Sequence, residues 1–222
     1  MTIVGYSDSR YPYLLKQIYD PPKRLYCWGN VDLLNYNHIS VVGTRNMTSY
    51  GRNVIENFLI TDFCDINIAV VSGLARGVDE FTHNTCLRKK IKTIAVIPTG
   101  VLNFRNETLR EIIKNDGLVL SEFPSKTIVQ KYMFVLRNRI IAGLSMHCVV
   151  IEAGLQSGSL ITAKYALENN RNVHIVPGSI FSNVSAGCNE LAKQGANILC
   201  RADDFYELMG LSKGQYKIPI KF

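Results

Sequence analysis

Three apolar runs, HISVVG (38–43), NIAVVSG (67–73) and TIAVIP (93–98), settle the class of fold to which this chain belongs. Each run is continuous and rich in Val and Ile, which is typical of a parallel strand covered on both faces. Helix-sized amphipathic stretches follow the first two runs, at about 49–62 and 77–90. A strand repeatedly followed by a helix predicts a parallel sheet with helices packed on its faces.

The same alternation continues toward the C-terminus. Further strand candidates lie at 118–121, 148–152, 173–178 and, more briefly, 196–199, and helix candidates lie at 106–115, 131–144, 159–170 and 188–194. We therefore expect an α/β fold with a doubly wound, mostly parallel sheet in a single domain at 36–210. Residues 1–35 break the alternation and predict a short N-terminal extension with one helix between Tyr11 and Pro22. The basic tail at 211–222 is expected to lie beyond the ordered core.

Composition excludes several classes of protein. The chain has 222 residues, of which 47% are hydrophobic and 19% charged, so it is neither disordered, collagenous nor a coiled coil. No apolar run approaches the roughly 20 residues that span a bilayer, and the N-terminus lacks the features of a signal peptide. The six cysteines form no C-x-x-C pair, which excludes the usual zinc spacings. We expect free thiols, a cytoplasmic location and no metal.

The charge balance is basic, with 25 Lys and Arg against 18 Asp and Glu. This excess is compatible with a polyanionic partner but does not identify one. Small and polar residues gather after the predicted strands, for example Gly43-Thr44-Arg45, Ser72-Gly73 and Glu152-Ala153-Gly154. Ligands of doubly wound sheets bind beyond these carboxyl ends. Ordinary turn chemistry, in which glycine lets the chain reverse, is the alternative interpretation.

Common cofactor and catalytic motifs are absent. The sequence contains no G-x-G-x-x-G after the first strand, no P-loop and no G-x-S-x-G elbow. We interpret the four isolated histidines as structural. Asp79 and Glu152 are conceivable general bases without an evident partner, and Asp79 is more simply a carboxylate in the first turn of a helix. No cofactor and no catalytic residue are expected.

The segment from Phe123 to Ile151 contains basic residues and no acidic one, which predicts an electropositive region. On a helix over 131–144, at about 100° per residue, one face holds the apolar side chains and must meet the core. Lys131, Phe134 and Asn138 lie off that face, with Arg137 at its border. Phe134 can therefore be a platform on which a base stacks. The alternative is that it packs beneath a neighbouring loop.

Two further segments predict a phosphate site beside this helix. Arg45 follows the first strand, and Thr48 or Ser49 can cap the next helix. The Ser157-Gly158-Ser159 turn opens a later helix, where exposed backbone N–H groups form an anion site.

Several blocks, in the right order, resemble the DNA-processing protein A (DprA/Smf) family. They are GTRNMTSYG (43–51), SGLARGVD (72–79), FVLRNRIIAGLS (134–145), EA at 152–153 with SGSLITA (157–163), PG at 177–178, GCNEL (187–191) and GA at 195–196. Cys188 stands where the family usually has Thr. Many members carry a C-terminal winged-helix-like domain, and we expect no such domain within the 222 residues of this sequence.

The resemblance implies an extended Rossmann-like domain that binds single-stranded DNA regardless of sequence. It implies a recombination mediator that loads RecA on incoming DNA in natural transformation, and a homodimer with no established catalytic activity. Carried over by motif, the DNA-binding residues are Gly43, Thr44, Arg45, Lys131, Phe134, Arg137, Asn138, Ser157, Gly158 and Ser159. Support for a dimer from the residues themselves is weak and comes from apolar segments at 173–176, 198–199 and 205–209.

Two other functions remain open. Related Rossmann-like folds include nucleotide phosphoribohydrolases, but their P-G-G-x-G-T-x-x-E signature is absent, and the nearest element, Pro98-Thr99-Gly100, is followed by VLN. A nucleotide-sensing module is the second alternative, because a phosphate pocket accepts a free nucleotide as readily as a strand.

Overall fold

The computed structural model describes residues 1–59, 67–104, 106–208 and 210. Within this part of the chain, one sheet of nine strands runs through the molecule in the order β1-β2-β6-β5-β4-β3-β7-β8-β9. The run β5-β4-β3-β7-β8-β9 has the 3-2-1-4-5-6 order of a Rossmann sheet. The predicted doubly wound, mostly parallel α/β fold is therefore confirmed.

All predicted strands are present and pair in parallel. Their bounds are β3 (Asn37–Val42), β4 (Ile68–Ser72), β5 (Thr93–Val96), β6 (Leu118–Ser121), β7 (His147–Val150), β8 (Asn172–Ile175) and β9 (Asn197–Ile198). The strands from β4 to β7 are buried almost throughout, because helices cover both faces of the sheet.

The first 35 residues contribute more than the predicted extension with its short helix. The helix is present as α1 (Tyr13–Lys16), and η1 (Val31–Asn35) leads into β3. On either side of α1, however, β1 (Thr2–Gly5) and β2 (Arg24–Gly29) add two antiparallel strands that join the sheet at β6. In β2 the burial alternates along RLYCWG, as expected of a strand with one solvated face.

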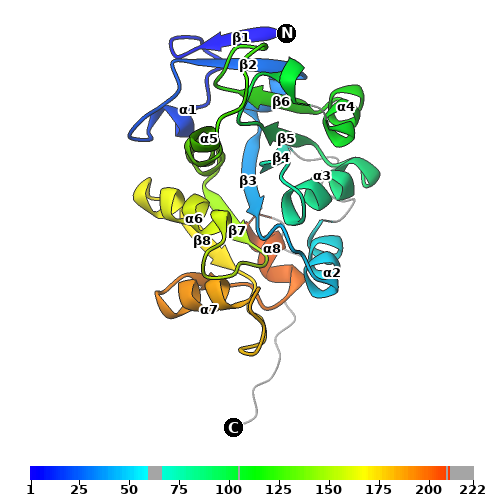
Figure 1. Cartoon of the computed structure of the whole chain (residues 1–222), viewed down its shortest axis with the longest axis vertical. Coiled ribbons are helices and arrows are strands. Elements are labelled where there is room, and N and C mark those ends of the chain that lie inside the picture. The colour runs from blue at the N-terminus through cyan, green and yellow to red at the C-terminus, as the bar shows by residue number, and fades with distance from the viewer. Residues whose placement is uncertain (60–66, 105, 209, 211–222) are drawn as a thin grey trace.

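Helices cover the two faces of the sheet, as Figure 1 shows. On one side lie α2 (Ser49–Phe58), α3 (Val78–Arg88), α4 (Glu107–Lys114) and α8 (Ala202–Leu208), with η3 (Val101–Asn103) before α4. On the other lie α1, α5 (Lys131–Leu144), α6 (Gly158–Glu168) and α7 (Ala186–Lys193). Helix α2 corresponds to the helix predicted at 49–62, of which residues 60–62 lie outside the described residues, as does the tail after Gly210.

Helix α5 corrects the helical-face prediction. Its C-terminal half is buried on all sides, including Arg137, Asn138 and Arg139. Leu136, one of the apolar side chains on the face that we expected to meet the core, is partly exposed. The reason is that α6 and α1 also pack on α5, so that it has more than one buried face. At Gly143 the approach is so close that a Cβ atom would lie 2.9 Å from Leu15 of α1 and 2.7 Å from Ile18, just beyond that helix.

The acid-free segment does not form one electropositive region, which corrects a second expectation. The Arg139 guanidinium lies 2.6 Å from the Glu122 carboxylate and 3.0 Å from that of Asp20, and its side chain is only 6% exposed. The Arg137 side chain points elsewhere and is also buried. Of the four basic residues, Lys126 and Lys131 remain exposed.

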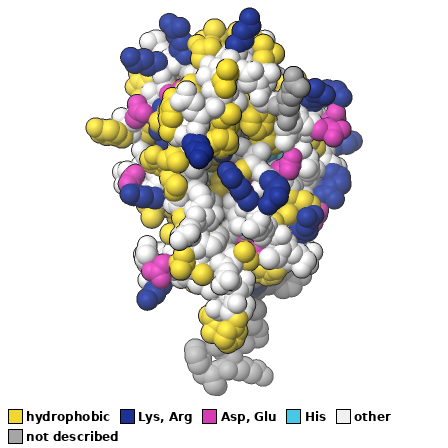
Figure 2. All heavy atoms as spheres, viewed as in Figure 1, with side chains coloured by type: hydrophobic (Ala, Val, Ile, Leu, Met, Phe, Trp, Pro, Cys, Tyr) yellow, Lys and Arg dark blue, Asp and Glu magenta, His cyan; other side chains and the backbone are white. Residues whose placement is uncertain are grey.

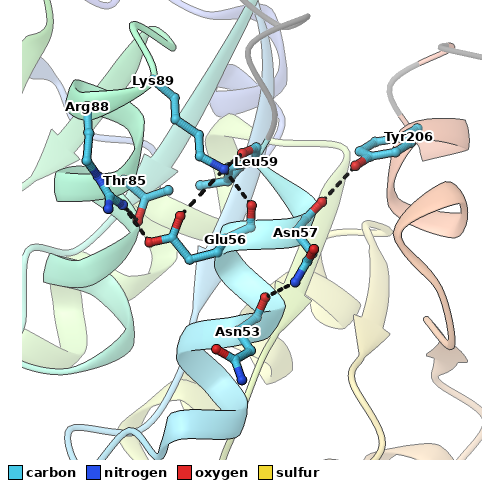
Figure 3. Close-up of polar contacts among 8 residues, drawn as sticks. All are labelled: Asn53, Glu56, Asn57, Leu59, Thr85, Arg88, Lys89 and Tyr206. Carbon is cyan, nitrogen blue, oxygen red and sulfur yellow. Dashed lines mark hydrogen bonds and ion pairs between the residues drawn. The ribbon is translucent and has the colours of Figure 1, made fainter.

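The C-terminal end of α2 is held by side chains from two other helices (Figure 3). Lys89 Nζ donates to the carbonyl oxygens of Glu56, at 2.5 Å, and Leu59, at 2.6 Å. The Tyr206 hydroxyl, from α8, donates to the carbonyl of Asn57 at 2.7 Å. The last carbonyls of a helix lack partners within it, so these bonds fix α2 against α3 and α8.

The apolar segments that weakly supported a dimer are mostly inside the monomer. Val173, Val176, Leu199 and Phe205 are each at most 4% exposed, and they pack in the cores on the two faces of the sheet. Among the described hydrophobic residues of these segments, only Ile198 is widely exposed. No helix in the described residues is long and apolar enough to cross a membrane.

Candidate functional site

A cleft of about 530 Å³ opens at the carboxyl ends of β3, β4 and β7. Here the strand order reverses between β3 and β7, the place where doubly wound sheets bind ligands. All but one of the predicted site residues line it. They are Gly43, Thr44, Arg45, Phe134, Arg137, Asn138, Ser157, Gly158 and Ser159. Lys131 is the exception: it is exposed at the first residue of α5 and does not line the cleft.

The loop after β3 is held tightly in place. Thr44 N donates to the carbonyl of Glu152 at 2.7 Å, and the N–H of Val78 donates to the carbonyl of Thr44 at 3.1 Å. At Gly43 a Cβ atom would lie 2.6 Å from the Val78 side chain, so glycine is required at this close approach. These contacts fix the backbone of the loop, and with it the position of Arg45 at the cleft.

Glu152 completes this loop and is not free to act as a base. Its carboxylate accepts from Thr48 N at 2.9 Å and from Thr48 Oγ1 at 2.5 Å. Thr48 caps α2 as the sequence predicted, with its hydroxyl accepting from Gly51 N. The buried Glu152 side chain thus ties the loop after β3 to the end of β7.

Arg45 and Phe134 form a pair at the rim. The guanidinium carbon of Arg45 lies 6.0 Å from the centroid of the Phe134 ring, within the range of a cation–π contact. Arg45 is exposed and has no carboxylate partner among the described residues, whereas Phe134 is half-buried. The pair offers a positive charge and an aromatic face to the same side of the cleft.

Arg137 is part of the floor and is not a free cation. Its Nη1 donates to the backbone carbonyls of Gly73 and Val96. Burial lowers the pKa of its guanidinium to about 10, although the nearby Asp79 carboxylate opposes that shift. A Cβ atom at Gly73 would lie 2.5 Å from the guanidinium, so the glycine makes room for it.

Asp79 is a buried residue of the cleft lining, near Arg137. It is in the first turn of α3, as predicted, but its carboxylate accepts from the backbone N–H groups of Gly43, Gly73 and Ala75. Burial raises the pKa of this carboxyl to about 6, and the charge of Arg137 and these hydrogen bonds only partly counteract it.

Helix α6 begins at the opposite wall. Ser157 is its N-cap: the side chain accepts from Ser159 N at 3.4 Å and lies 2.7 Å from Ser159 Oγ. Asn138 Nδ2 donates to the carbonyl of Gly158 at 3.4 Å, which links α5 to this turn. Leu160 N donates to the Ser157 carbonyl at 3.1 Å, so the first turn of α6 is closed by its own residues. The positive end of the α6 dipole is thus at the cleft, which favours an anion there.

Figure 2 shows several Lys and Arg side chains near the middle of this face, between the parts of the molecule labelled α5 and α3 in Figure 1. The structure also adds lining residues that the sequence did not single out: Asn46, Ala75, Gln156, Asn183 and Val184. Asn183 and Val184 come from the loop before α7, and no periodicity or motif within that loop predicts its place beside the cleft.

The histidines and cysteines are elsewhere. His147 Nδ1 and His174 Nε2 lie 3.0 Å apart, the ring of His83 bonds to Thr93, and His38 bonds to two carbonyl oxygens. Among the described residues no cluster of three or more His, Cys, Asp or Glu side chains could hold a metal ion. The described cysteines are free thiols, and Cys64 lies outside the described residues.

Comparisons with known proteins agree on one family. The model of the DNA recombination-mediator protein A family matches residues 2–210. DNA processing protein DprA of Bacillus subtilis is 41% identical over 217 residues, which cover 96% of this chain and 73% of that protein. Protein Smf of Escherichia coli is 36% identical over 218 residues, which cover 96% of this chain and 58% of that protein.

Solved structures show the same likeness. The crystal structure of DprA from Streptococcus pneumoniae superposes with a TM-score of 0.85 at 38% identity, covering 96% of this chain and 75% of that one. A structure of DNA processing protein A from Helicobacter pylori, described with its single-stranded DNA binding mode, gives a TM-score of 0.79 at 28% identity over 94% of this chain and 96% of that chain. On this evidence of sequence and fold, the chain belongs to the DNA-processing protein A (DprA/Smf) family.

Proposed function

We propose that the chain binds single-stranded DNA, without regard to sequence, in the cleft between β3 and β7. The observation that carries the proposal is the Arg45–Phe134 pair, which sets an unpaired cation and an aromatic face opposite the N-terminus of α6. Together these supply two positions for phosphate and one for a base. Stacking on an aromatic face accepts any base, which accounts for binding that is independent of sequence.

The shape of the site favours an unpaired strand over a duplex. The Phe134 ring lies at the rim of a cleft of about 530 Å³, where a base must leave its stack to reach it. Helices α5 and α6 are largely packed against the sheet and each other, so neither projects as the reading helix of a major groove requires. The Helicobacter pylori relative, described by its single-stranded DNA binding, supports the same choice.

Membership of the family supports the proposal of a wider role. We propose a recombination mediator that loads RecA on incoming DNA in natural transformation, acts as a homodimer and works in the cytoplasm. These points rest on the family alone. RecA nucleation on a single strand, measured with and without the chain, tests the first of them. Light scattering at tens of micromolar tests the second, and a monomer would contradict it.

One observation favours the alternative of an enzyme or a nucleotide sensor. Asp79 is a buried carboxyl with a raised pKa in a cleft, and such groups are typical of functional sites. Its three backbone donors and its burial instead favour a structural role. We therefore propose a binding protein without catalytic activity.

A competition assay separates these functions. Oligo-dT, a duplex of equal length and a mononucleotide are compared at two salt concentrations, and products are checked for base released from nucleoside monophosphates. We expect the single strand to bind well above the duplex and the mononucleotide, with no released base. Equal affinity for duplex and single strand would falsify the proposal. Mononucleotide binding as tight as that of the strand would favour the sensor.

A further inference from the structure

A second cleft, of about 400 Å³, lies beside the first. Of the residues that the structure describes, four line both clefts: Arg45, Ala75, Phe134 and Arg137. We propose that this second cleft is a further base subsite, which takes the neighbouring nucleotide of the same single strand. The inference rests on the proposed function, because it extends the path of the strand across the Arg45–Phe134 pair.

The residues shared by the two clefts determine the path that we propose for the strand. Because Arg45 and Phe134 line both clefts, a strand that passes from one cleft to the other stays in contact with this pair. The Arg45 guanidinium, 6.0 Å from the Phe134 ring, then lies where the phosphate between the two nucleotides must pass. A phosphate contact at this joint positions the strand while each base turns to its own side.

The second cleft has the chemistry that a nucleotide needs. Leu74, Pro98 and Phe104 supply apolar and aromatic surface, and no Asp or Glu is among the described residues that line this cleft. Arg76 is exposed at its edge, and the guanidinium donates to the neutral Asn46 side chain at 3.0 Å. Among the described residues Arg76 has no carboxylate partner, so its charge remains available for a phosphate.

The loop that carries Arg76 has an unusual backbone. Leu74 has a φ of 55° although it is not glycine, and its side chain is buried. Such a conformation costs free energy and is found most often at functional sites. Three residues further along the chain, Gly77 has a φ of 92°, and a Cβ atom there would lie 2.4 Å from the Thr44 carbonyl oxygen. The two residues turn the loop against the one that carries Arg45, which brings Arg76 beside the first cleft.

A length series from thymidine monophosphate, which fills one cleft only, through the dinucleotide to longer oligo-dT tests the proposal. It uses the whole chain and the variants Arg76→Ala and Phe104→Leu, since leucine keeps the packing of the half-buried Phe104 but removes its ring. Arg24→Ala is the matched control, because Arg24 is an exposed arginine on β2 that lines neither cleft.

We expect all proteins to bind the shortest strands alike, and the wild type and control to gain affinity once the strand is long enough to fill both clefts. Phe104→Leu should lose about five- to 150-fold of that gain, which is the range for stacking one base on an aromatic ring. Arg76→Ala should lose part of the gain and about 0.7 of the salt slope. If both variants match the wild type at every length, or lose affinity equally at all lengths, the second subsite is overturned while the first stands.

Photo-cross-linking gives an independent readout. A strand carrying iododeoxyuridine at one position should cross-link to Phe134, and a strand labelled at the adjacent position should cross-link to Phe104. Cross-links to Phe134 alone, whatever the position, contradict the second subsite. If the wild type binds no strand of any length, the proposed function fails together with this extension, which distinguishes that outcome from the others.

Discussion

Arg45 and Phe134 should contribute different physical terms to binding. Arg45→Ala removes one cation, so it should weaken binding of all sequences alike and lower the slope of log affinity against log salt by roughly 0.7. Phe134→Ala removes stacking, so it should cost about 1–3 kcal/mol and leave the salt slope nearly unchanged. Binding isotherms across a salt series measure both, with Arg24→Ala as the charge-matched control.

Both variants should keep the fold, because Arg45 is exposed and Phe134 is only half-buried. Unfolding of Phe134→Ala, seen by circular dichroism, would show that the ring is part of the core. An unchanged affinity and slope for Arg45→Ala would mean that phosphate is bound elsewhere.

Asp79 should make stability depend on pH. Its carboxyl pKa is raised from 3.8 to about 6 in the fold, so folding favours the protonated form. The stabilisation is fully present below pH 3.8 and is lost as pH rises through about 6, by about 3 kcal/mol in all. Asp79→Asn cannot ionise, so its stability relative to the wild type should rise between pH 4 and 7. Urea unfolding at a series of pH values checks this, and a relative stability that falls over that range would contradict it.

At the scale of elements, the stability of the C-terminal end of α2 should depend on one side chain, Lys89, at the C-cap of α3. Lys89 satisfies two carbonyls there with a positive charge, at the negative end of the helix dipole (Figure 3). Lys89→Met should therefore lower the free energy of unfolding by about 1–3 kcal/mol, the range for bonds to a charged group. Lys90→Met, at the exposed neighbouring residue, is the control and should change stability little. Equal effects of the two changes would contradict this role of Lys89.

At the scale of the whole molecule, residues 1–35 should be needed for folding. They carry β1, β2 and α1, and their side chains Val4, Leu15, Leu25 and Leu33 are fully buried in one core. Uncovering that core costs about 2 kcal/mol for each such side chain, and a domain is stable by only about 5–15 kcal/mol. A chain starting at residue 36 should therefore aggregate or melt far below the full chain. Gel filtration and thermal melts test this, and a stable monomer would show that the segment is dispensable.

The class of fold and much of the site follow from local sequence. Continuous Val and Ile runs predicted every parallel strand, because a strand covered on both faces has no polar side to alternate. Thr48 and Ser157 cap helices as expected, since a cap is a contact between residues a few positions apart. The strand ends then converge by topology alone, which brought Arg45, Phe134 and Ser157 to one cleft.

Long-range packing accounts for the rest. Arg137 and Arg139 are two residues apart on α5, yet one bonds to backbone carbonyls beside Asp79 and the other forms ion pairs with Glu122 and Asp20. Helical periodicity reports that a face is buried, but it carries no information on which distant elements cover the helix. For the same reason it could not show that β2 pairs with β6 or that Arg76 lies beside Arg45 and Phe134 in a second cleft. Those placements arise only when segments far apart in the chain are packed around one sheet.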